Sequence, residues 1–266
     1  MLENLNLKKK FSTEEYKRIL PGLQARLYDL ENACWQNGIS TVIVFEGWDA
    51  SGKGTSIRAV TQRLDPRGFK LYCITEPRTY EQQRPWLWRF WLRVPNRGEM
   101  VIFDHSWYGR VLQERLEHMV PEKAAQQAFR DIAEFERMLA DDGTVLVKFF
   151  LHISKKEQRR RFAAIASDPL EAWRVTKEDW ARHKKYDRYV AAAEEMLELT
   201  ESEYAPWTIV EATSKSYTRK CVFETIISAL ERSLGPKAPP RIIATLDLSR
   251  DAELRQAVED LTRGDA

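Results

Sequence analysis

Residues 41–55 read Thr-Val-Ile-Val-Phe-Glu-Gly-Trp-Asp-Ala-Ser-Gly-Lys-Gly-Thr, and this stretch decides the fold. The run 41–45 is short, apolar and β-branched, as expected for a strand that is buried on both faces. A glycine-rich loop follows at residues 47–55, and helix-forming sequence follows the loop. This order predicts a phosphate-binding loop, because backbone N–H groups converge on a phosphate at the N-terminus of the helix.

The residue types within this loop indicate separate roles. Lys53 adds a full positive charge beside the phosphates. The next position holds glycine where Ser or Thr commonly contacts Mg²⁺, so Thr55 or carboxylates are expected to serve the metal instead. Asp49 would repel a phosphate unless a cation lay between them, which predicts that Asp49 holds Mg²⁺; a turn residue that bonds its own backbone is the alternative. Three glycines leave room for the phosphate: Gly47, Gly52 and Gly54.

Four further apolar runs predict the rest of a sheet. They cover residues 69–75, 100–103, 145–151 and 207–210, and the segments between them are long enough for crossover helices. This alternation predicts an α/β fold with three αβα layers around a five-stranded parallel sheet. Ser12 and Glu15 form the pattern of a capping box, which predicts a helix that runs towards Trp35 and ends at Gly38.

Three regions are expected along the chain. Residues 1–40 form an N-terminal helical segment, and residues 41–234 form the catalytic domain. Within that domain the polar, helix-forming stretch 154–199 is too long for a plain crossover, so it is interpreted as an inserted helical lid. Residues 235–266 begin with Gly-Pro-Lys-Ala-Pro-Pro and are interpreted as a linker-like tail.

A second carboxylate is expected beside the loop. Asp104 ends the third strand, and the carboxyl ends of parallel strands share one edge of the sheet. An Asp at this position orients the metal in nucleotide-binding folds, so Asp49 and Asp104 are the predicted metal ligands. A solvated residue at a strand end is the alternative interpretation of Asp104.

Composition excludes several classes of protein. The 266 residues are 43% hydrophobic and 31% charged, which is typical of a globular chain rather than a disordered one. The net charge of +2 gives no overall positive field for nucleic acid. Three scattered cysteines favour neither disulfides nor a zinc site and point to the cytoplasm. No leader or membrane-spanning stretch is evident, so no membrane partner is expected.

Taken together, the motifs resemble the polyphosphate kinase 2 family. The resemblance rests on G-x-D-x-x-G-K-G-T, E-P-R, D-H-S-W-Y-G-R, S-K-K-E-Q-R-R-R-F and A-P-W, in this order over residues 11–234. It is greatest to one half of the two-domain polyphosphate:AMP phosphotransferases. The resemblance implies a P-loop kinase-like fold and transfer of a terminal phosphoryl group between inorganic polyphosphate and a nucleoside mono- or diphosphate, with AMP or ADP favoured. Mg²⁺ is the implied metal, Mn²⁺ an alternative, and a homo-oligomer is expected.

The resemblance also extends to individual residues. The glycines, Asp49 and Lys53 match the family's first motif, Asp104 and Arg110 match its second, and Lys155 and Arg161 match basic residues of its lid. One departure is His105, which stands where the family usually has Arg; a mostly neutral imidazole holds phosphate less firmly than a guanidinium does. Further phosphate-binding candidates are Arg89, Arg159 and Arg160. The resemblance implies that Lys155, Arg159, Arg160 and Arg161 close over the polyanion from the lid.

Each basic candidate also has a structural interpretation. The run 155–161 resembles an ordinary solvated helix face, although residues at successive positions must include some that point back towards the sheet. Around Arg89, the aromatic residues Trp88 and Trp91 have the spacing of a helix face that packs into a core. His118, His152 and His183 lack metal-ligand spacing and are interpreted as ordinary surface or core histidines.

Two other functions remain open at this point. The segment Phe-Glu-Gly followed by G-K-G-T also resembles thymidylate and adenylate kinases, which would make ATP the donor. A non-catalytic module that binds polyphosphate or nucleotide, as one half of an assembly, is the other alternative. No Ser-His-Asp or Cys-His arrangement is visible, and phosphoryl transfer needs none because it depends on alignment and charge neutralisation.

Overall fold

The chain forms a five-stranded parallel sheet. In the computed structural model, residues 1–240 are described, and the predictions for 241–266 lie outside the described residues. The strand order is β2-β3-β1-β4-β5, and each neighbouring pair is parallel. The predicted sheet is therefore confirmed. Its strands are β1 (Thr41–Gly47), β2 (Phe69–Cys73), β3 (Met100–Asp104), β4 (Val145–His152) and β5 (Trp207–Glu211).

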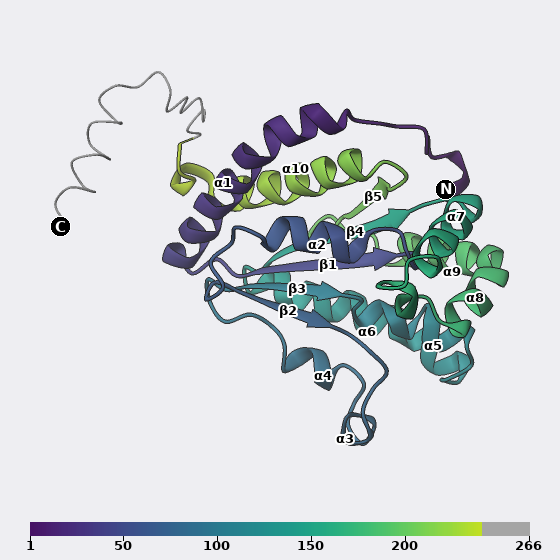
Figure 1. Ribbon diagram of the computed structural model, residues 1–266. Helices are drawn as coiled ribbons and strands as arrows, with labels where there is room; N and C mark the ends of the chain where they lie inside the picture. The colour runs from purple at the N-terminus through teal and green to yellow at the C-terminus, as the bar shows by residue number, and fades with distance from the viewer. Residues whose placement is uncertain (241–266) are drawn as a thin grey trace.

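Helices cover both faces of this sheet, and a third group lies beyond the carboxyl ends of its strands (Figure 1). One face carries α1 (Thr13–Asn37), α2 (Lys53–Thr61) and α10 (Lys215–Leu234). The other face carries α4 (Trp88–Trp91) and α6 (Glu122–Asp141). Helix α3 (Thr79–Gln82) lies beyond α4, farther from the sheet. Beyond the carboxyl ends lie α5 (Gln113–Leu116), α7 (Lys155–Ala166), α8 (Lys177–Lys184) and α9 (Tyr186–Leu199). Short 3₁₀ turns are η1 (Leu2–Asn4), η2 (Trp107–Arg110), η3 (Ala172–Arg174) and η4 (Gly235–Lys237).

Helix α1 begins and ends where the sequence predicts, but its cap differs in one detail. The Ser12 hydroxyl accepts the Glu15 N–H at 3.2 Å, as expected. The reciprocal bond, from the Ser12 backbone N–H to the Glu15 carboxylate, is not formed within the described residues, and the Ser12 hydroxyl donates to the Glu14 carboxylate at 3.0 Å. The prediction of a full capping box is therefore wrong. Gly38 ends the helix in the left-handed conformation, at φ 66°.

The centre of the sheet is completely enclosed. Residues 42–45 of β1 are all 0% exposed, because helices cover both faces. Register places Phe45 of β1 opposite Asp104 of β3 and opposite Phe149 of β4. The ends of these three strands therefore lie side by side, and the loops that follow β1 and β3 emerge together. Among residues 1–240, no helix has both the length and the apolar character that crossing a bilayer requires.

A buried ion pair lies under the segment that follows β3. Lys148 of β4 is 0% exposed and pairs with Glu136 of α6 at 2.8 Å. Its ammonium also donates to the Tyr108 hydroxyl and to the Thr200 carbonyl oxygen, each at 2.9 Å. Trp107 and Tyr108 in turn donate to Glu136 at 3.0 and 2.6 Å. This network fixes η2 on the core, directly after Asp104.

Candidate functional site

Two glycines give the loop between β1 and α2 its shape. Gly47 has φ 126° and Gly52 has φ 110°, values that residues with a Cβ rarely adopt. A Cβ at Gly47 would also lie 2.4 Å from the carbonyl oxygen of Leu151 on β4. Gly52 is the N-cap of α2, so the free N–H groups of the first helical turn face the loop. The backbone is therefore arranged as the sequence predicts for a phosphate-binding loop.

Lys53 lies across this loop. Its ammonium donates to the carbonyl oxygens of Gly47 and Trp48 at 2.9 and 3.1 Å, and the residue is 7% exposed. Thr55 donates its hydroxyl to the carbonyl oxygen of Gly52 at 3.0 Å. Both side chains thus lie at the N-terminus of α2, where an anion would gain from the ammonium and the helix dipole together.

Asp104 presents a carboxylate oxygen that has no protein partner. Its Oδ1 is buried and makes no hydrogen bond with any of the residues that the structure describes. Its Oδ2 lies 3.9 Å from the position that a Cβ on Gly54 would take. This carboxylate therefore lies beside the first turn of α2. A buried oxygen without a partner is costly unless another group binds it.

Asp49 is ionised in a largely enclosed position. Burial alone would raise the pKa of its carboxyl, but the charges of Lys53 and Arg182 outweigh burial and hold the pKa below its ordinary value. Oδ2 of Asp49 accepts a hydrogen bond from Nε of Arg182 at 2.9 Å. The loop therefore carries a carboxylate that stays negative, together with two cations that neutralise it.

These two carboxylates suit a metal that keeps few protein ligands. Within residues 1–240, no group of three or more His, Cys, Asp or Glu side chains could hold a metal ion. Mg²⁺ is commonly bound by one or two carboxylates together with substrate phosphates and water, so a larger cluster is not required. The unpartnered Oδ1 of Asp104 is the observation that favours a cation here. The donor set therefore fits Mg²⁺, with water molecules or phosphates completing its coordination.

His105 borders the same cavity as Asp49. Its backbone is strained, with φ 60°, and its N–H donates to the carbonyl oxygen of Phe45 at 3.1 Å. Its Nδ1 lies 3.4 Å from Oε2 of the buried Glu46, whose other oxygen accepts the Ser106 hydroxyl at 2.8 Å. Both His105 and Asp49 line a cavity of about 70 Å³, which has room for a few water molecules or an ion.

Arg161 lies elsewhere than the sequence interpretation places it. Its guanidinium donates to four carbonyl oxygens at 2.7–3.0 Å and its Nε donates to Glu157 at 2.7 Å. The residue is 8% exposed, so it supports the loop from the carbonyl side rather than closing over a polyanion. Its four carbonyl partners belong to Ala50, Ser51, Ala212 and Thr213.

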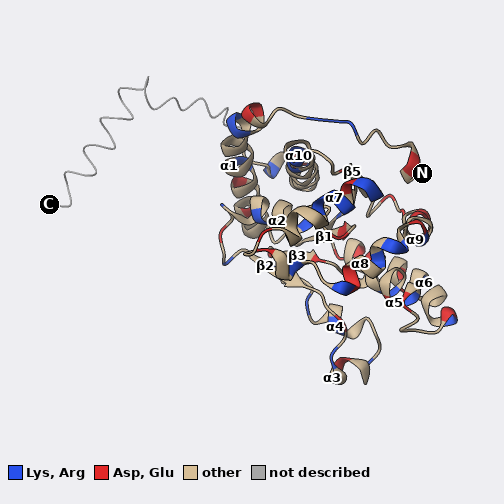
Figure 2. Ribbon diagram, turned by 45° about the vertical axis from the view of Figure 1, so that its right-hand side comes forward, with Lys and Arg blue, Asp and Glu red and all other residues tan. Residues whose placement is uncertain are grey.

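Lys and Arg make up much of α7 (Figure 2), and its basic residues other than Arg161 are partly or fully exposed. Lys155 pairs with Asp187 at 2.8 Å, and Arg160 pairs with Glu157 at 2.7 Å. Arg159 is exposed on the same helix. These three cations face solvent at the carboxyl end of the sheet, whereas Arg161 of the same helix points inward.

Arg89 and Arg110 border a second cavity, of about 220 Å³. Arg89 donates to the carbonyl oxygen of Thr75 at 2.8 Å, and Arg110 pairs with Glu114 at 2.9 Å. Each has a buried Nε without a hydrogen-bond partner in the described part of the chain. Gly109 lines the first cavity and Arg110 the second, so η2 separates the two. The aromatic spacing around Arg89 does serve packing, since Trp91 contacts the ring of Phe135.

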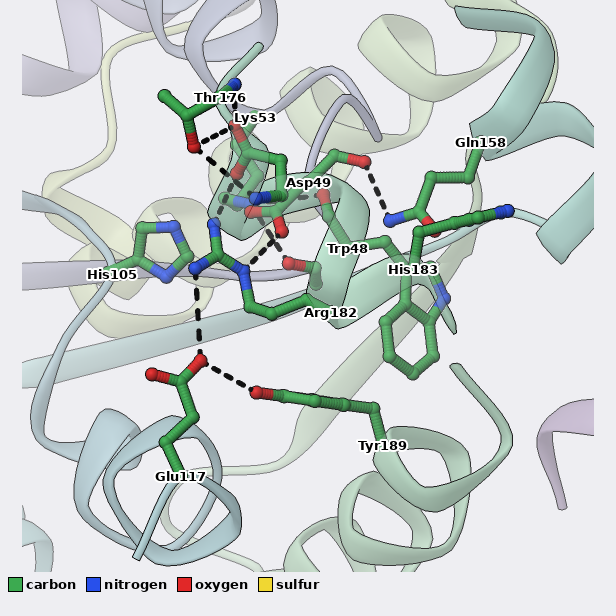
Figure 3. Close-up of polar contacts among 12 residues, drawn as sticks. Trp48, Asp49, Lys53, His105, Glu117, Gln158, Thr176, Arg182, His183 and Tyr189 are labelled. Carbon is green, nitrogen blue, oxygen red and sulfur yellow. Dashed lines mark hydrogen bonds and ion pairs between the residues drawn. The ribbon is translucent and has the colours of Figure 1, made fainter. Parts of the chain in front are cut away.

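Several residues of this site were not identified from the sequence. Figure 3 shows Arg182 between Asp49 and Glu117, with Tyr189 donating to Glu117 at 3.0 Å. Arg182 lies among the many basic residues of 154–199, and nothing in its local pattern distinguishes it from them.

A second unexpected contact joins α8 to the loop through neutral groups. Gln158 of α7 donates its amide to the backbone carbonyl oxygen of Asp49 at 3.2 Å, and its amide oxygen lies 2.8 Å from Nδ1 of His183 (Figure 3). The interpretation of His183 as an ordinary histidine therefore misses its contact with the loop. His152 does belong to the core, where burial lowers its pKa to about 4 and it accepts a hydrogen bond from Trp48 at 2.9 Å.

Comparison with known proteins gives consistent results. The family model described as polyphosphate kinase 2 matches residues 10–237. A polyphosphate:AMP phosphotransferase from Pseudomonas aeruginosa is 42% identical over 87% of this chain and 47% of its own length. An AMP/ADP-polyphosphate phosphotransferase from Meiothermus ruber is 38% identical over 79% of each chain. The chain spans about half the length of the first of these relatives.

Solved structures show the same fold. A polyphosphate kinase 2 structure from Arthrobacter aurescens covers 97% of this chain and 93% of its own, at 29% identity and a TM-score of 0.85. A structure from Pseudomonas aeruginosa has the same TM-score at 41% identity, but this chain covers only 50% of it. The architecture therefore extends over nearly the whole of the described chain.

Proposed function

Because this chain belongs to the polyphosphate kinase 2 family, we propose that it transfers a terminal phosphoryl group between inorganic polyphosphate and a nucleoside mono- or diphosphate. In the direction of nucleotide synthesis, a terminal phosphate oxygen of the nucleotide forms the new bond to phosphorus. The bridging P–O bond of the polyphosphate breaks, and the chain leaves one unit shorter with its negative charge. AMP and ADP are the preferred acceptors in this proposal.

One observation carries the proposal more than any other. A carboxylate oxygen of Asp104 is buried and has no hydrogen-bond partner among residues 1–240, beside the first turn of α2, where Lys53 also lies. A binding module for phosphate alone would have no use for an anion at this position, since Asp104 would repel its ligand. A cation between carboxylate and phosphate removes this conflict, and catalysis of phosphoryl transfer requires one.

In this proposal Asp49 and Asp104 hold Mg²⁺, or Mn²⁺ in its place. The metal neutralises charge on the phosphoryl oxygens. Lys53 donates to phosphate oxygens once it exchanges the loop carbonyls for them, and the N–H groups of α2 bind the same oxygens. His105 contributes less positive charge than the Arg usual at its position, so Arg110 or another guanidinium supplies the remainder.

Segment 154–199 acts as the lid in this proposal. Lys155, Arg159 and Arg160 are cations at the surface of α7, and Lys155 and Arg160 would exchange Asp187 and Glu157 for the phosphates of a polyphosphate chain. Arg89 and Arg110 offer a second anion-binding position across η2, since neither buried Nε has a hydrogen-bond partner among residues 1–240, although Nε of Arg89 lies 3.6 Å from the Glu81 carboxylate. Subunit association remains a prediction, and the free cysteines favour a reducing cytoplasm as the compartment.

The proposal is tested by the choice of donor. Purified protein is incubated with Mg²⁺ and long-chain polyphosphate together with AMP, ADP, GMP or GDP in turn, and the products are separated by chromatography. We expect ADP from AMP, or ATP from ADP, with polyphosphate shortened by an equal number of units. A parallel reaction replaces polyphosphate with ATP and offers AMP as acceptor.

Two results would reject the proposal in different ways. ADP formed from ATP and AMP, without any use of polyphosphate, would identify an ATP-dependent nucleoside monophosphate kinase. Binding of polyphosphate without turnover of any nucleotide, with Mg²⁺ or with Mn²⁺, would identify a module that binds but does not catalyse.

A further inference from the structure

Arg182 joins three parts of the site through three different nitrogen atoms (Figure 3). Its Nε donates to Oδ2 of Asp49 at 2.9 Å, its Nη2 pairs with Oδ1 of Asp179, and its Nη1 lies 3.8 Å from Oε1 of Glu117. Asp49 belongs to the glycine loop, Asp179 to α8 itself, and Glu117 follows α5. One side chain therefore fastens the lid helix α8 to the loop.

The contact with Asp49 places Arg182 where a metal would need to bind. Asp49 is one of the two carboxylates that the proposed function assigns to a divalent cation, and the present inference rests on that assignment. A guanidinium and a divalent cation at the same carboxylate oxygen repel each other and compete for the same space. We propose that Arg182 is a positioning residue that holds Asp49 until a divalent cation displaces it, and that this exchange unfastens α8 from the loop.

The other partners of Arg182 lower the free energy needed to break its contact with Asp49. After Nε leaves Asp49, Nη2 still faces Asp179 and Nη1 still faces Glu117. Both carboxylates are held in place independently, because Asp179 caps α8 by accepting the Thr176 N–H at 2.7 Å and Glu117 accepts the Tyr189 hydroxyl at 3.0 Å. The guanidinium is thus never left buried without a counter-ion, which is the state that costs most.

The exchange would leave α8 attached by weaker contacts. The other connection between α8 and the loop runs from His183 through Gln158 to the backbone carbonyl oxygen of Asp49, at 2.8 and 3.2 Å. The amide–carbonyl hydrogen bond in this connection is uncharged and is weaker than a guanidinium–carboxylate pair. Metal binding is therefore expected to loosen α8, so that it can adjust to a polyphosphate chain.

Metal binding to the protein without nucleotide or polyphosphate tests the competition. Mn²⁺ is titrated into the full chain by isothermal titration calorimetry, for the wild type, Arg182→Gln and Lys184→Gln. Lys184 is an exposed cation on the same helix and makes no hydrogen bond or ion pair with Asp49. Arg182→Gln is expected to bind Mn²⁺ roughly tenfold more tightly than the wild type, as loss of a competing ion pair predicts. Lys184→Gln is expected to stay within about twofold of the wild type, because exposed charges act weakly.

A second measurement follows the mobility of the lid helix α8. Hydrogen exchange of the α8 amides is recorded for the wild type with and without Mg²⁺, and faster exchange with Mg²⁺ is expected. Arg182→Gln should exchange quickly in α8 even without Mg²⁺. The proposal is overturned if Mg²⁺ leaves α8 exchange unchanged or slows it, if Arg182→Gln and Lys184→Gln bind Mn²⁺ alike, or if neither wild type nor Arg182→Gln binds Mn²⁺.

Failure of this inference is distinguishable from failure of the proposed function. If the wild type turns over polyphosphate but the two variants bind Mn²⁺ alike, displacement of Arg182 by the metal is rejected and the proposed function is unaffected. If Arg182→Gln binds Mn²⁺ more tightly but the wild type transfers no phosphoryl group, displacement of Arg182 by the metal is supported and the proposed function is rejected.

Discussion

Gly47 is the residue at which β1 passes into the glycine loop, and it pairs with Leu151 of β4. Its φ is 126°, and a Cβ added to it would lie 2.4 Å from the Leu151 carbonyl oxygen, which leaves no room for a side chain. We expect Gly47→Ala to lower the free energy of unfolding by about 3 kcal/mol, since backbone strain and a steric clash add together. Urea denaturation measures the change.

Gly22 provides the matched control for this substitution. It lies within α1, and a Cβ there would meet nothing within 4 Å. Gly22→Ala should raise the free energy of unfolding by up to about 1 kcal/mol, because alanine is the better helix former. Equal effects of the two substitutions would contradict the assignment of Gly47 as a conformational requirement of the loop.

Arg161 allows a test of whether its hydrogen bonds to the carbonyl oxygens of the loop stabilise the folded protein. Removing its guanidinium leaves four carbonyl oxygens without this donor, whereas the Glu157 carboxylate keeps its pair with Arg160. Arg161→Gln is expected to lower the free energy of unfolding by about 2–4 kcal/mol. Arg160→Gln, at an exposed position on the same helix, should change it by less than about 0.5 kcal/mol, as expected for a surface pair. Similar unfolding midpoints for the two variants would show that Arg161 does not support the loop.

At the scale of elements, the ion pair between β4 and α6 fixes the segment that carries the second motif. Lys148→Met leaves Glu136 buried without a counter-ion, and we expect a loss of about 3–5 kcal/mol in the free energy of unfolding. Lys148→Met combined with Glu136→Leu should recover part of this loss, because no buried charge then remains unpaired. A double variant less stable than Lys148→Met alone would contradict this account.

The contact between α1 and the turn before β2 should depend on pH. Burial raises the pKa of Glu31 to about 7, although its Oε2 accepts the Asp65 N–H at 2.9 Å. Because this folded-state pKa exceeds the ordinary value of 4.5, the folded protein binds more protons than the unfolded chain between these values. Stability should therefore fall as the pH rises from about 5 to 7, and level off above that range.

Glu31→Gln removes this dependence. The variant should show a flatter profile of unfolding midpoint in urea between pH 5 and 8 than the wild type, with the larger gain at pH 8. Glu198→Gln, at an exposed position on α9, should keep the wild-type profile. An unchanged slope in Glu31→Gln would mean that another group titrates in this window.

Much of the element order could be predicted because it follows from local pattern. Each buried strand is a run of β-branched or aromatic residues between polar segments, and α1 has a Ser12 cap and a Gly38 end. Lys148 is an exception within such a run. Its burial depends on Glu136 and Tyr108, which come from other elements, and no pattern within the strand could indicate that partnership.

The site was predictable only in part, for the same reason. The loop and Asp104 follow directly from strand ends, where sequence position determines spatial position. Arg161 and Arg182 are similar in sequence, since each is a basic residue on a polar helix. Their orientation depends on how α7 and α8 pack against the loop. Arg161 donates to carbonyl oxygens of the loop, whereas Arg182 binds the Asp49 carboxylate.

At the scale of the whole molecule, the parallel sheet brings distant segments to one edge. One cavity is lined by the loop after β1, the motif after β3 and the helices after β4. The first and last of these segments lie more than a hundred residues apart in the sequence. Related structures have the same architecture over nearly the whole described chain. The chain spans about half the length of several relatives, and its described residues contain both motifs and the helices that cover them.

Asp104→Asn tests whether phosphoryl transfer needs the carboxylate at the end of β3. The proposed transfer requires two carboxylates beside the glycine loop, so polyphosphate-dependent phosphorylation of AMP or ADP is measured for the wild type, Asp104→Asn and Asp142→Asn. Asp142 forms an exposed pair with Arg97 and controls for the loss of a carboxylate. Asp104→Asn should unfold at the same urea concentration as the wild type but turn over at least about a hundredfold more slowly, while Asp142→Asn keeps full turnover. An Asp104→Asn protein as active as the wild type would contradict the account.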